Sequence, residues 1–253
     1  SSAIRSVVLG ENCICWPQIL VSCGSITAAA MIVSINFFIR CVFIMCKFSI
    51  FAEKKRICLL KINNSAGEGM TDFIKTPIEG VWIIEPQRFG DKRGYFCETY
   101  RRCDFEAIVG EVDFVQENES FSSGRVIRGL HMQRGQAAQA KLVRVSQGRV
   151  LDVAVDMRPG SATFGQHVAV ELDAESGRQL FVPRGFAHGF AVLSDFAQFQ
   201  YKVDNYYAPE AELCLRFDDP VVAVEWPFDT SEAILSPKDL SGLSFNEFCE
   251  KLK

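Results

Sequence analysis

The chain has 253 residues, of which 48% are hydrophobic and 23% are charged. This composition is that of a folded globular protein rather than a disordered chain, and the length allows one large domain or two small ones. The formal net charge of −4 argues against a nucleic-acid-binding protein, because such proteins neutralise phosphates with an excess of Lys and Arg.

The first 69 residues differ in character from the rest of the chain. They carry seven Lys/Arg and three Asp/Glu, a net of +4, so the remainder carries 20 basic and 28 acidic residues, a net of −8. Six of the ten cysteines also fall before residue 70, and no two cysteines have CxxC spacing. We therefore place a domain boundary between regions 1–69 and 70–253. The scattered later cysteines predict a cytoplasmic domain with reduced thiols.

Residues 19–39 form an uncharged run of 21 residues, long enough to cross a bilayer as a helix. Arg40 interrupts the run, and a basic flank that begins at Lys47 would place everything downstream in the cytoplasm. Region 1–69 could hold a membrane anchor over 19–46, be a targeting segment or a poorly ordered extension, or be translated upstream sequence, with Met70 as the natural start. We favour a non-native or functionally irrelevant extension and expect membrane contact only if the anchor is genuine.

From residue 70 on, apolar and polar residues alternate in short runs bounded by turn residues, a pattern typical of β-strands. We expect strands over 80–89, late in 90–100, over 112–122 and over 125–133, with a short helix over 103–110. After these we expect a hairpin over 140–158 turning at "SQG", two strands within 167–183, further strands over 185–194 and 197–207, and a short C-terminal helix. About ten short strands predict an all-β sandwich or barrel.

Two motifs narrow this class to a cupin-type double-stranded β-helix, or jelly roll. The stretch "GRQLFVPRGFAH" has the second cupin motif's spacing in Gly177, Pro183, Gly185 and His188. The first motif should supply two histidines as HxH, but His131 is followed by Met132 and Gln133. One histidine from each motif is too few for a His-rich metal site, so we expect no metal ion.

Strand alternation allows several proton-transfer groups to share one cavity, namely His131, His188, Lys141 and Tyr201. A His can act as a base near neutral pH, a Lys ammonium can stabilise an enolate, and a Tyr can return a proton to the opposite face. Such a set suits inversion of a stereocentre beside a carbonyl. Arg93 and Arg128 could hold a phosphate-bearing substrate. A structural role stays open for His188, because the cupin turn would aim it inward in any case.

At this point the sequence resembles a known family, the dTDP-4-dehydrorhamnose 3,5-epimerases, which are metal-free cupins. The resemblance covers residues 73–243 and is carried, in the family's order, by "FGDKRGYFCETY", "FVQENES", "RGLHMQ", "AKLVRVSQGRVLDVAVDMR", "VPRGFAHGF" and "LSPKDL". It implies an isomerase that inverts carbons 3 and 5 of dTDP-4-dehydro-6-deoxyglucose, in dTDP-L-rhamnose or related deoxysugar biosynthesis. It further implies a homodimer that needs no cofactor.

The resemblance also implies a role for each matching residue. His131 would be the base and Asp239 its carboxylate partner, while Tyr201 would be the opposite acid and Lys141 would stabilise the enolate. The implied substrate-binding residues are Arg93 and Arg128 at the diphosphate, Tyr206 on thymine, and Glu98, Gln116, Asn118, His188, Glu212 and Lys238 around the sugar and nucleotide. Family members exchange strands between subunits, so Phe89 or Phe96 would serve the neighbouring site.

Other functions remain compatible with the same residues. A single-site epimerase or ketoisomerase acting on a related dTDP-sugar could use the same proton-transfer set. A non-catalytic jelly roll would bind a nucleotide sugar without moving a proton, and a metal-dependent cupin oxygenase would require an ion. The chain departs from the family's usual pattern at Glu117, Arg125 and Met132, which affects the expected substrate preference more than proton transfer.

Overall fold

The computed structural model describes residues 60–62 and 71–252. The hydrophobic run over 19–46 and nearly all of region 1–69 therefore lie outside the described residues. None of the helices in the described ranges combines the length and apolar character needed to span a bilayer.

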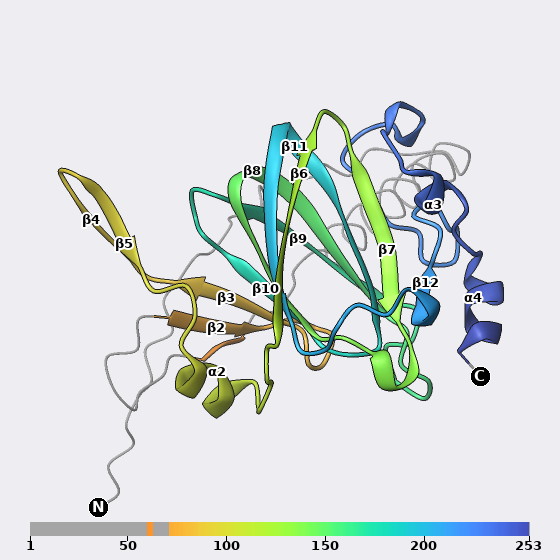
Figure 1. The fold of residues 1–253 in the computed structure, drawn as a ribbon, viewed down its shortest axis with the longest axis horizontal. Helices are drawn as coiled ribbons and strands as arrows, with labels where there is room; N and C mark the ends of the chain where they lie inside the picture. Colours follow the sequence, from red (N-terminus) through yellow and green to blue (C-terminus); the bar gives the residue numbers. More distant parts are fainter. Residues whose placement is uncertain (1–59, 63–70, 253) are drawn as a thin grey trace, which may run out of the picture. The chain divides into compact units, whose positions relative to one another are not determined.

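Ten strands of the described chain form one antiparallel sheet that folds over on itself, in the order β1-β2-β3-β10-β8-β11-β7-β12. Strand β6 adds to β11, and β9 adds to β8 (Figure 1). The strands are β1 (Leu60–Ile62), β2 (Thr71–Lys75), β3 (Trp82–Pro86), β6 (Gln116–Ser123), β7 (Ile127–Gln133), β8 (Lys141–Asp156), β9 (His167–Asp173), β10 (Gln179–Val182), β11 (Phe186–Val203) and β12 (Glu212–Cys214). A separate hairpin joins β4 (Arg88–Asp91) to β5 (Gly94–Cys97).

The two long strands β8 and β11 belong to both layers of the sandwich. The first part of β8 pairs with β10 and with the end of β11, and that end of β11 also pairs with β6. The second part of β8 pairs with β9 and with the start of β11, which also pairs with β7. Each long strand therefore passes from one sheet to the other, which confirms the expected jelly roll.

The predicted hairpin at "SQG" is wrong, because residues 141–156 form one continuous strand. Gly148 has a φ of +79°, and a Cβ at this position would lie 2.0 Å from the Phe196 carbonyl oxygen. The pairing of β8 with β11 shifts register opposite this point, between Val192 and Ala197. A glycine in the left-handed region thus bends a strand here instead of closing a turn. The two strands predicted over 185–194 and 197–207 likewise merge into β11.

The helices are short, and two of them pack against the outside of the barrel. α2 (Arg102–Ile108) and α4 (Phe245–Lys251) confirm the two predicted helices, and α3 (Pro237–Leu240) is an unpredicted single turn. Phe105 of α2 packs against β2, β3 and β10 through Phe73, Trp82 and Phe181. Phe248 of α4 packs on the side of the barrel that carries β7 and β12.

The main hydrophobic core fills the space between the two sheets. It includes Val143, Val150, Leu172, Leu180 and Phe199, all at most 2% exposed. Tyr201 packs against the edge of this core, so the apolar filling ends where the polar residues of the barrel begin. A cavity lies at this junction.

Candidate active site

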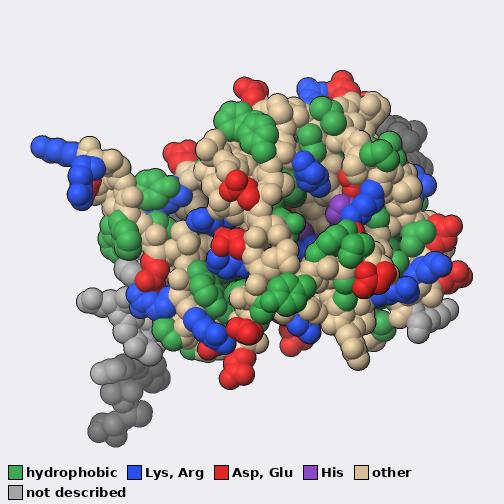
Figure 2. Space-filling model, in the orientation of Figure 1, with side chains coloured by type: hydrophobic (Ala, Val, Ile, Leu, Met, Phe, Trp, Pro, Cys, Tyr) green, Lys and Arg blue, Asp and Glu red, His purple; other side chains and the backbone are tan. Residues whose placement is uncertain are grey.

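A cavity of about 520 Å³ opens into the barrel between β6, β7, β8, β11, β12 and α3. The space-filling view shows a hollow in which histidine is visible between basic and acidic side chains (Figure 2). Ten of the fifteen residues predicted for the site line it: Gln116, Asn118, Arg128, His131, Lys141, His188, Tyr201, Glu212, Lys238 and Asp239.

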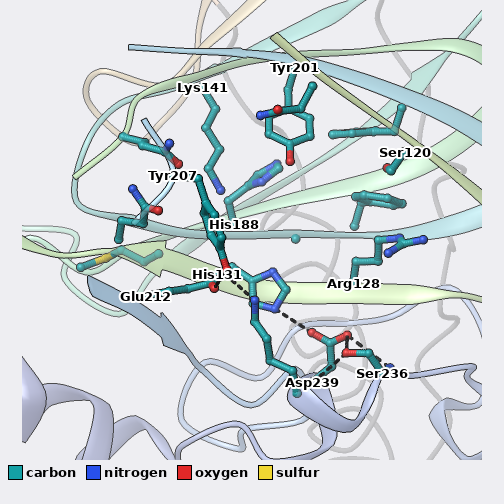
Figure 3. Close-up of a pocket in the computed structure, with 18 of the residues that line it drawn as sticks. Ser120, Arg128, His131, Lys141, His188, Tyr201, Tyr207, Glu212, Ser236 and Asp239 are labelled. Atoms are coloured by element: carbon teal, nitrogen blue, oxygen red, sulfur yellow. Dashed lines mark hydrogen bonds and ion pairs between the residues drawn. The ribbon is translucent and has the colours of Figure 1, made fainter. Parts of the chain in front are cut away.

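His131 and Asp239 form a contact pair on one side of the cavity (Figure 3). Nε2 of His131 lies 2.7 Å from Oδ1 of Asp239. The carboxylate is buried, with 3% exposure, whereas the imidazole is 25% exposed and can be reached from the cavity. Such a carboxylate orients the ring and stabilises its protonated form, leaving Nδ1 able to accept a proton.

The short helix α3 fixes Asp239 in the "SPKDL" segment. Ser236 is the N-cap and Pro237 the first helical residue, so Asp239 takes the third position of a capping box. The Ser236 hydroxyl donates to Oδ2 of Asp239 at 2.6 Å, and the Gly129 N–H donates to Oδ1 at 3.2 Å. Burial would raise the pKa of Asp239, but its bonds to His131 and Ser236 outweigh burial and hold the pKa at about 2. The carboxyl is therefore a carboxylate at any pH near neutrality.

His188 is held by a second carboxylate, which was not predicted from the sequence. Its Nε2 lies 3.0 Å from both oxygens of Asp152 on β8. Burial lowers the pKa of His188, although Asp152 opposes the effect. Strands β7 and β11 approach closely beside it, because a Cβ on Gly189 would lie 2.4 Å from the Arg128 carbonyl oxygen. His188 is thus a neutral, rigid part of the cavity wall.

Lys141 and Tyr201 face the cavity from β8 and β11 (Figure 3). Burial lowers the pKa of Lys141 to about 8, so its ammonium is still largely protonated at pH 7. Burial raises the pKa of Tyr201, so its hydroxyl keeps its proton at neutral pH. The hydroxyl points into the cavity from the side opposite His131 (Figure 3). A base and an acid therefore lie across the space from each other, and the Lys141 ammonium faces the same space.

Replacing Lys141 with Met should make the protein more stable at pH 7, because the native state then no longer buries an ammonium. The wild-type pKa falls from 10.5 in the unfolded chain to about 8 in the native protein. Between these values the unfolded state binds more protons, so wild-type stability rises with pH across this window. The variant should lack that rise, as urea unfolding at pH 7 and pH 10 would measure.

Lys251→Met is the matched control, since Lys251 is exposed at the end of α4. It should leave the pH dependence of stability as in the wild type. A Lys141→Met variant that is less stable than the wild type at pH 7 would contradict a costly buried ammonium.

Arg128 provides a positive charge near Tyr201. Its Nε donates to the Ser122 hydroxyl at 3.0 Å and one terminal nitrogen donates to the Phe121 carbonyl at 3.2 Å. No carboxylate neutralises it in the contacts of the described residues. A guanidinium positioned by neutral acceptors can bind an anion such as a phosphate.

A third wall of the cavity is made of paired polar groups. Lys238 lies 2.6 Å from Glu212, and the Tyr207 hydroxyl donates to Glu212 at 2.8 Å. These bonds outweigh burial and lower the pKa of Glu212. Tyr207 was not predicted, since the strand ends at Val203 and alternation in "DNYY" cannot tell which tyrosine turns inward.

Five predicted residues lie away from this cavity: Phe89, Arg93, Phe96, Glu98 and Tyr206. Arg93 forms an exposed ion pair with Asp91, and Glu98 pairs with Arg101. Phe89 and Phe96 face each other across β4 and β5 and are 43% and 64% exposed. Tyr206 is 66% exposed. One chain alone does not bring these residues to the base.

Comparisons with known proteins identify the family of the domain that holds this cavity. The dTDP-4-dehydrorhamnose 3,5-epimerase family profile matches residues 75–247. The dTDP-4-dehydrorhamnose 3,5-epimerase of Escherichia coli K12 is 55% identical over 66% of this chain and 90% of its own. The crystal structure of a Legionella pneumophila 3,5-epimerase in complex with dTDP-4-keto-L-rhamnose is 46% identical, with a TM-score of 0.69 over 72% of this chain and 96% of that one.

A third relative is named as an epimerase of a single centre. The 3'-monoepimerase of Streptomyces bikiniensis in complex with dTDP-quinovose is 33% identical, with a TM-score of 0.65 over 70% of this chain and 89% of that one. The profile match, the sequence identity and the shared fold all cover the domain that holds the cavity. This chain belongs to the dTDP-4-dehydrorhamnose 3,5-epimerase family.

Proposed function

We propose that this protein inverts carbons 3 and 5 of dTDP-4-dehydro-6-deoxyglucose, a step toward dTDP-L-rhamnose or a related deoxysugar. The observation that carries the proposal is the placement of the His131–Asp239 pair and Tyr201 on opposite sides of one cavity (Figure 3). Inversion beside a ketone needs a base on one face of the sugar and an acid on the other. Membership of the family supports the choice of substrate.

In the first step, His131 takes the proton from a carbon next to the C4 ketone. The electron pair of the C–H bond forms a C=C bond, and the C=O electrons move onto oxygen to give an enolate. Asp239 acts as a positioning residue that stabilises the resulting imidazolium across 2.7 Å. A partly exposed imidazole beside a buried carboxylate suits this role.

The enolate oxygen needs a positive partner, and we assign that role to Lys141. Its ammonium lies in a desolvated part of the cavity, where a charge stabilises an anion more strongly than it would in water. Tyr201 then donates its proton to the opposite face of the carbon, which completes the inversion. The tyrosinate recovers a proton from solvent, His131 releases its proton to solvent, and the sequence repeats at the second carbon.

Arg128 would hold the diphosphate, and Gln116 and Asn118 line the same cavity. Gln116 donates its amide hydrogen to Asn118 at 2.7 Å, so the two side chains form one polar surface. Glu212, Lys238 and His188 would complete the sugar and nucleotide pocket. Every proton-transfer group in this scheme comes from the chain, so we propose a reaction that needs neither metal ion nor cofactor.

Heavy water provides the direct test. The purified full chain is mixed with dTDP-4-dehydro-6-deoxyglucose in D₂O and the sugar signals are followed by proton NMR. The proposal expects deuterium at both C3 and C5 and a product with both centres inverted. Binding of the nucleotide sugar without deuterium uptake would exclude the epimerase and favour a binding module.

A single-site epimerase is the second candidate, because a 3'-monoepimerase shares this fold with a TM-score of 0.65. The same base, acid and lysine would serve either enzyme. The same NMR experiment separates the two, since the single-site enzyme would place deuterium at one carbon only. A ketoisomerase would instead move the carbonyl to a different carbon, which the carbon chemical shifts would reveal.

We also propose that the protein works as a homodimer in which the β4–β5 hairpin completes the neighbour's site. The hairpin extends from the body of the domain and exposes Phe89, Phe96 and Arg93 (Figure 1). Two facing exposed aromatic rings on an isolated hairpin are typical of a surface that another chain covers. Arg93 would then reach the diphosphate bound by Arg128 of the neighbouring chain.

Mixing two inactive variants tests this exchange. A His131→Ala chain has a defective cavity and an intact hairpin, whereas an Arg93→Ala chain has the reverse. After unfolding and refolding together, about a quarter of the sites should combine an intact cavity with an intact hairpin. Activity in the mixture should rise toward that fraction, whereas a mixture that stays as inactive as its parents would contradict the exchange.

We further propose that residues 70–253 form the epimerase domain and that it works in the cytoplasm. The family profile covers residues 75–247, which fall within this range. Cys97, Cys103 and Cys214 are thiols, as expected in a reducing compartment. Fractionation of cells, with antibody detection of the protein, would test the location.

A further inference from the structure

Three different metal-ligating groups meet beside the cavity, two of which, His131 and Asp239, line it. A ring nitrogen of His131, the sulfur of Cys214 and a carboxylate oxygen of Asp239 all lie within 4.8 Å of one another. Cys214 plays no part in the proposed proton transfers. Its thiol makes only a long contact of 3.8 Å with the Leu215 carbonyl oxygen among the hydrogen bonds of the described residues.

The fold holds these three groups together from three separate segments. Cys214 on β12 is the antiparallel register partner of His131 on β7, so their side chains are direct cross-strand neighbours. Asp239 comes from α3, where the capping box with Ser236 fixes its carboxylate. The grouping is therefore part of the folded framework and does not depend on a flexible loop.

The set of donors matches the chemistry of a borderline-soft divalent cation. Zn²⁺ binds Cys sulfur at about 2.3 Å and His nitrogen or carboxylate oxygen at about 2.0–2.2 Å, so ligand atoms in a tetrahedral site lie roughly 3.3–3.8 Å apart. The three ligand atoms lie within 4.8 Å of one another, so side-chain rotation would have to bring them to those separations. The open cavity supplies space for a water or chloride as the fourth ligand.

We propose that His131, Cys214 and Asp239 form an inhibitory binding site for a Zn²⁺-class cation. The ion binds the thiolate, and the thiol proton passes to solvent. A neutral imidazole has one lone pair, and once that pair binds the metal the ring cannot accept a substrate proton. The inhibition, unlike the binding, rests on the proposed role of His131 as the base.

The surrounding charges are compatible with a bound cation. Lys238, whose charge acts on Cys214, is already paired with Glu212 at 2.6 Å. The carboxylate of Asp239 and the thiolate of Cys214 together balance the two positive charges of the ion. A hard cation such as Mg²⁺ should bind poorly, because it prefers six oxygen ligands.

The test compares Zn²⁺ inhibition of the full-chain enzyme with that of two cysteine variants. Zn²⁺ should inhibit the wild type, EDTA should restore its activity, and Mg²⁺ should have no effect. Cys214→Ser should keep the basal activity and need at least about tenfold more Zn²⁺, since a lost ligand costs at least as much as a lost outer-shell partner. Cys103→Ser, at an exposed thiol, should behave as the wild type.

A second measurement locates the ion without relying on activity. Crystals soaked in Cd²⁺ should show an anomalous-scattering peak within bonding distance of all three ligand atoms, and the peak should vanish in Cys214→Ser. Equal inhibition of wild type and Cys214→Ser, activation by Zn²⁺, or a peak found only at other cysteines would overturn the proposal. If the chain has no epimerase activity, the proposed function fails, while the Cd²⁺ peak still decides whether the site exists.

Discussion

Replacing His131 with Asn is expected to abolish both inversion of the sugar and exchange of its hydrogens with heavy water. The imidazole supplies the lone pair that takes the proton, and Asn offers no base of comparable strength. General bases contribute about 10²–10⁴-fold, so the rate of deuterium uptake at C3 and C5 should fall at least about a hundredfold. Proton NMR in D₂O measures this directly. The proton signals of C3 and C5 disappear as deuterium replaces them in the wild type, and they should persist in the variant.

His167→Asn is a matched control for this substitution. His167 lies on β9, is partly buried and does not line the cavity, so the same chemical change there should leave the exchange rate unaltered. The His131 variant should still bind dTDP, because Arg128 and the polar wall remain. Less than about a tenfold loss in His131→Asn would mean that another group removes the proton.

The jelly roll could be predicted from the sequence because strand alternation and the turn around Pro183 and Gly185 are local signals. Which strands are continuous and which are joined by turns was harder to predict from the sequence. Gly148 is compatible both with a hairpin turn and with a bend inside a long strand, and the choice depends on its contact with Phe196 from β11. That contact joins residues 48 positions apart, so no local pattern could reveal it.

The site divides in the same way. Alternation placed Lys141 and Tyr201 correctly on the cavity side of their strands, because each strand is regular where it carries them. Asp239 was accessible only through the family resemblance, since its position depends on a helix cap and on contacts about 110 residues away. Asp152 could have been suspected, because a charged residue in the apolar run "VLDVAVD" requires a buried partner.

Replacing Tyr201 with Phe should separate proton removal from inversion. His131 remains able to take the proton, and in D₂O it can return a deuteron to the same face. The variant should therefore produce labelled substrate with unchanged configuration, while formation of the inverted product falls by about 10²–10⁴-fold. Burial raises the pKa of Tyr201, so the wild-type hydroxyl is a proton donor at neutral pH and its removal eliminates the acid.

Tyr100→Phe gives the comparison for this second substitution. Tyr100 packs against Phe105 and Phe114 outside the cavity, and burial raises its pKa as it does for Tyr201. Its loss of a hydroxyl should alter neither exchange nor inversion. Three measurements on the Tyr201 variant then decide whether Tyr201 is the acid. They are the deuterium content of the substrate, the deuterium content of the product, and the extent of inversion at C3 compared with that at C5. If inversion in Tyr201→Phe continued at the wild-type rate, the proton on the opposite face would have to come from solvent or another side chain, and the two-sided arrangement of His131 and Tyr201 would not be the source of the stereochemistry.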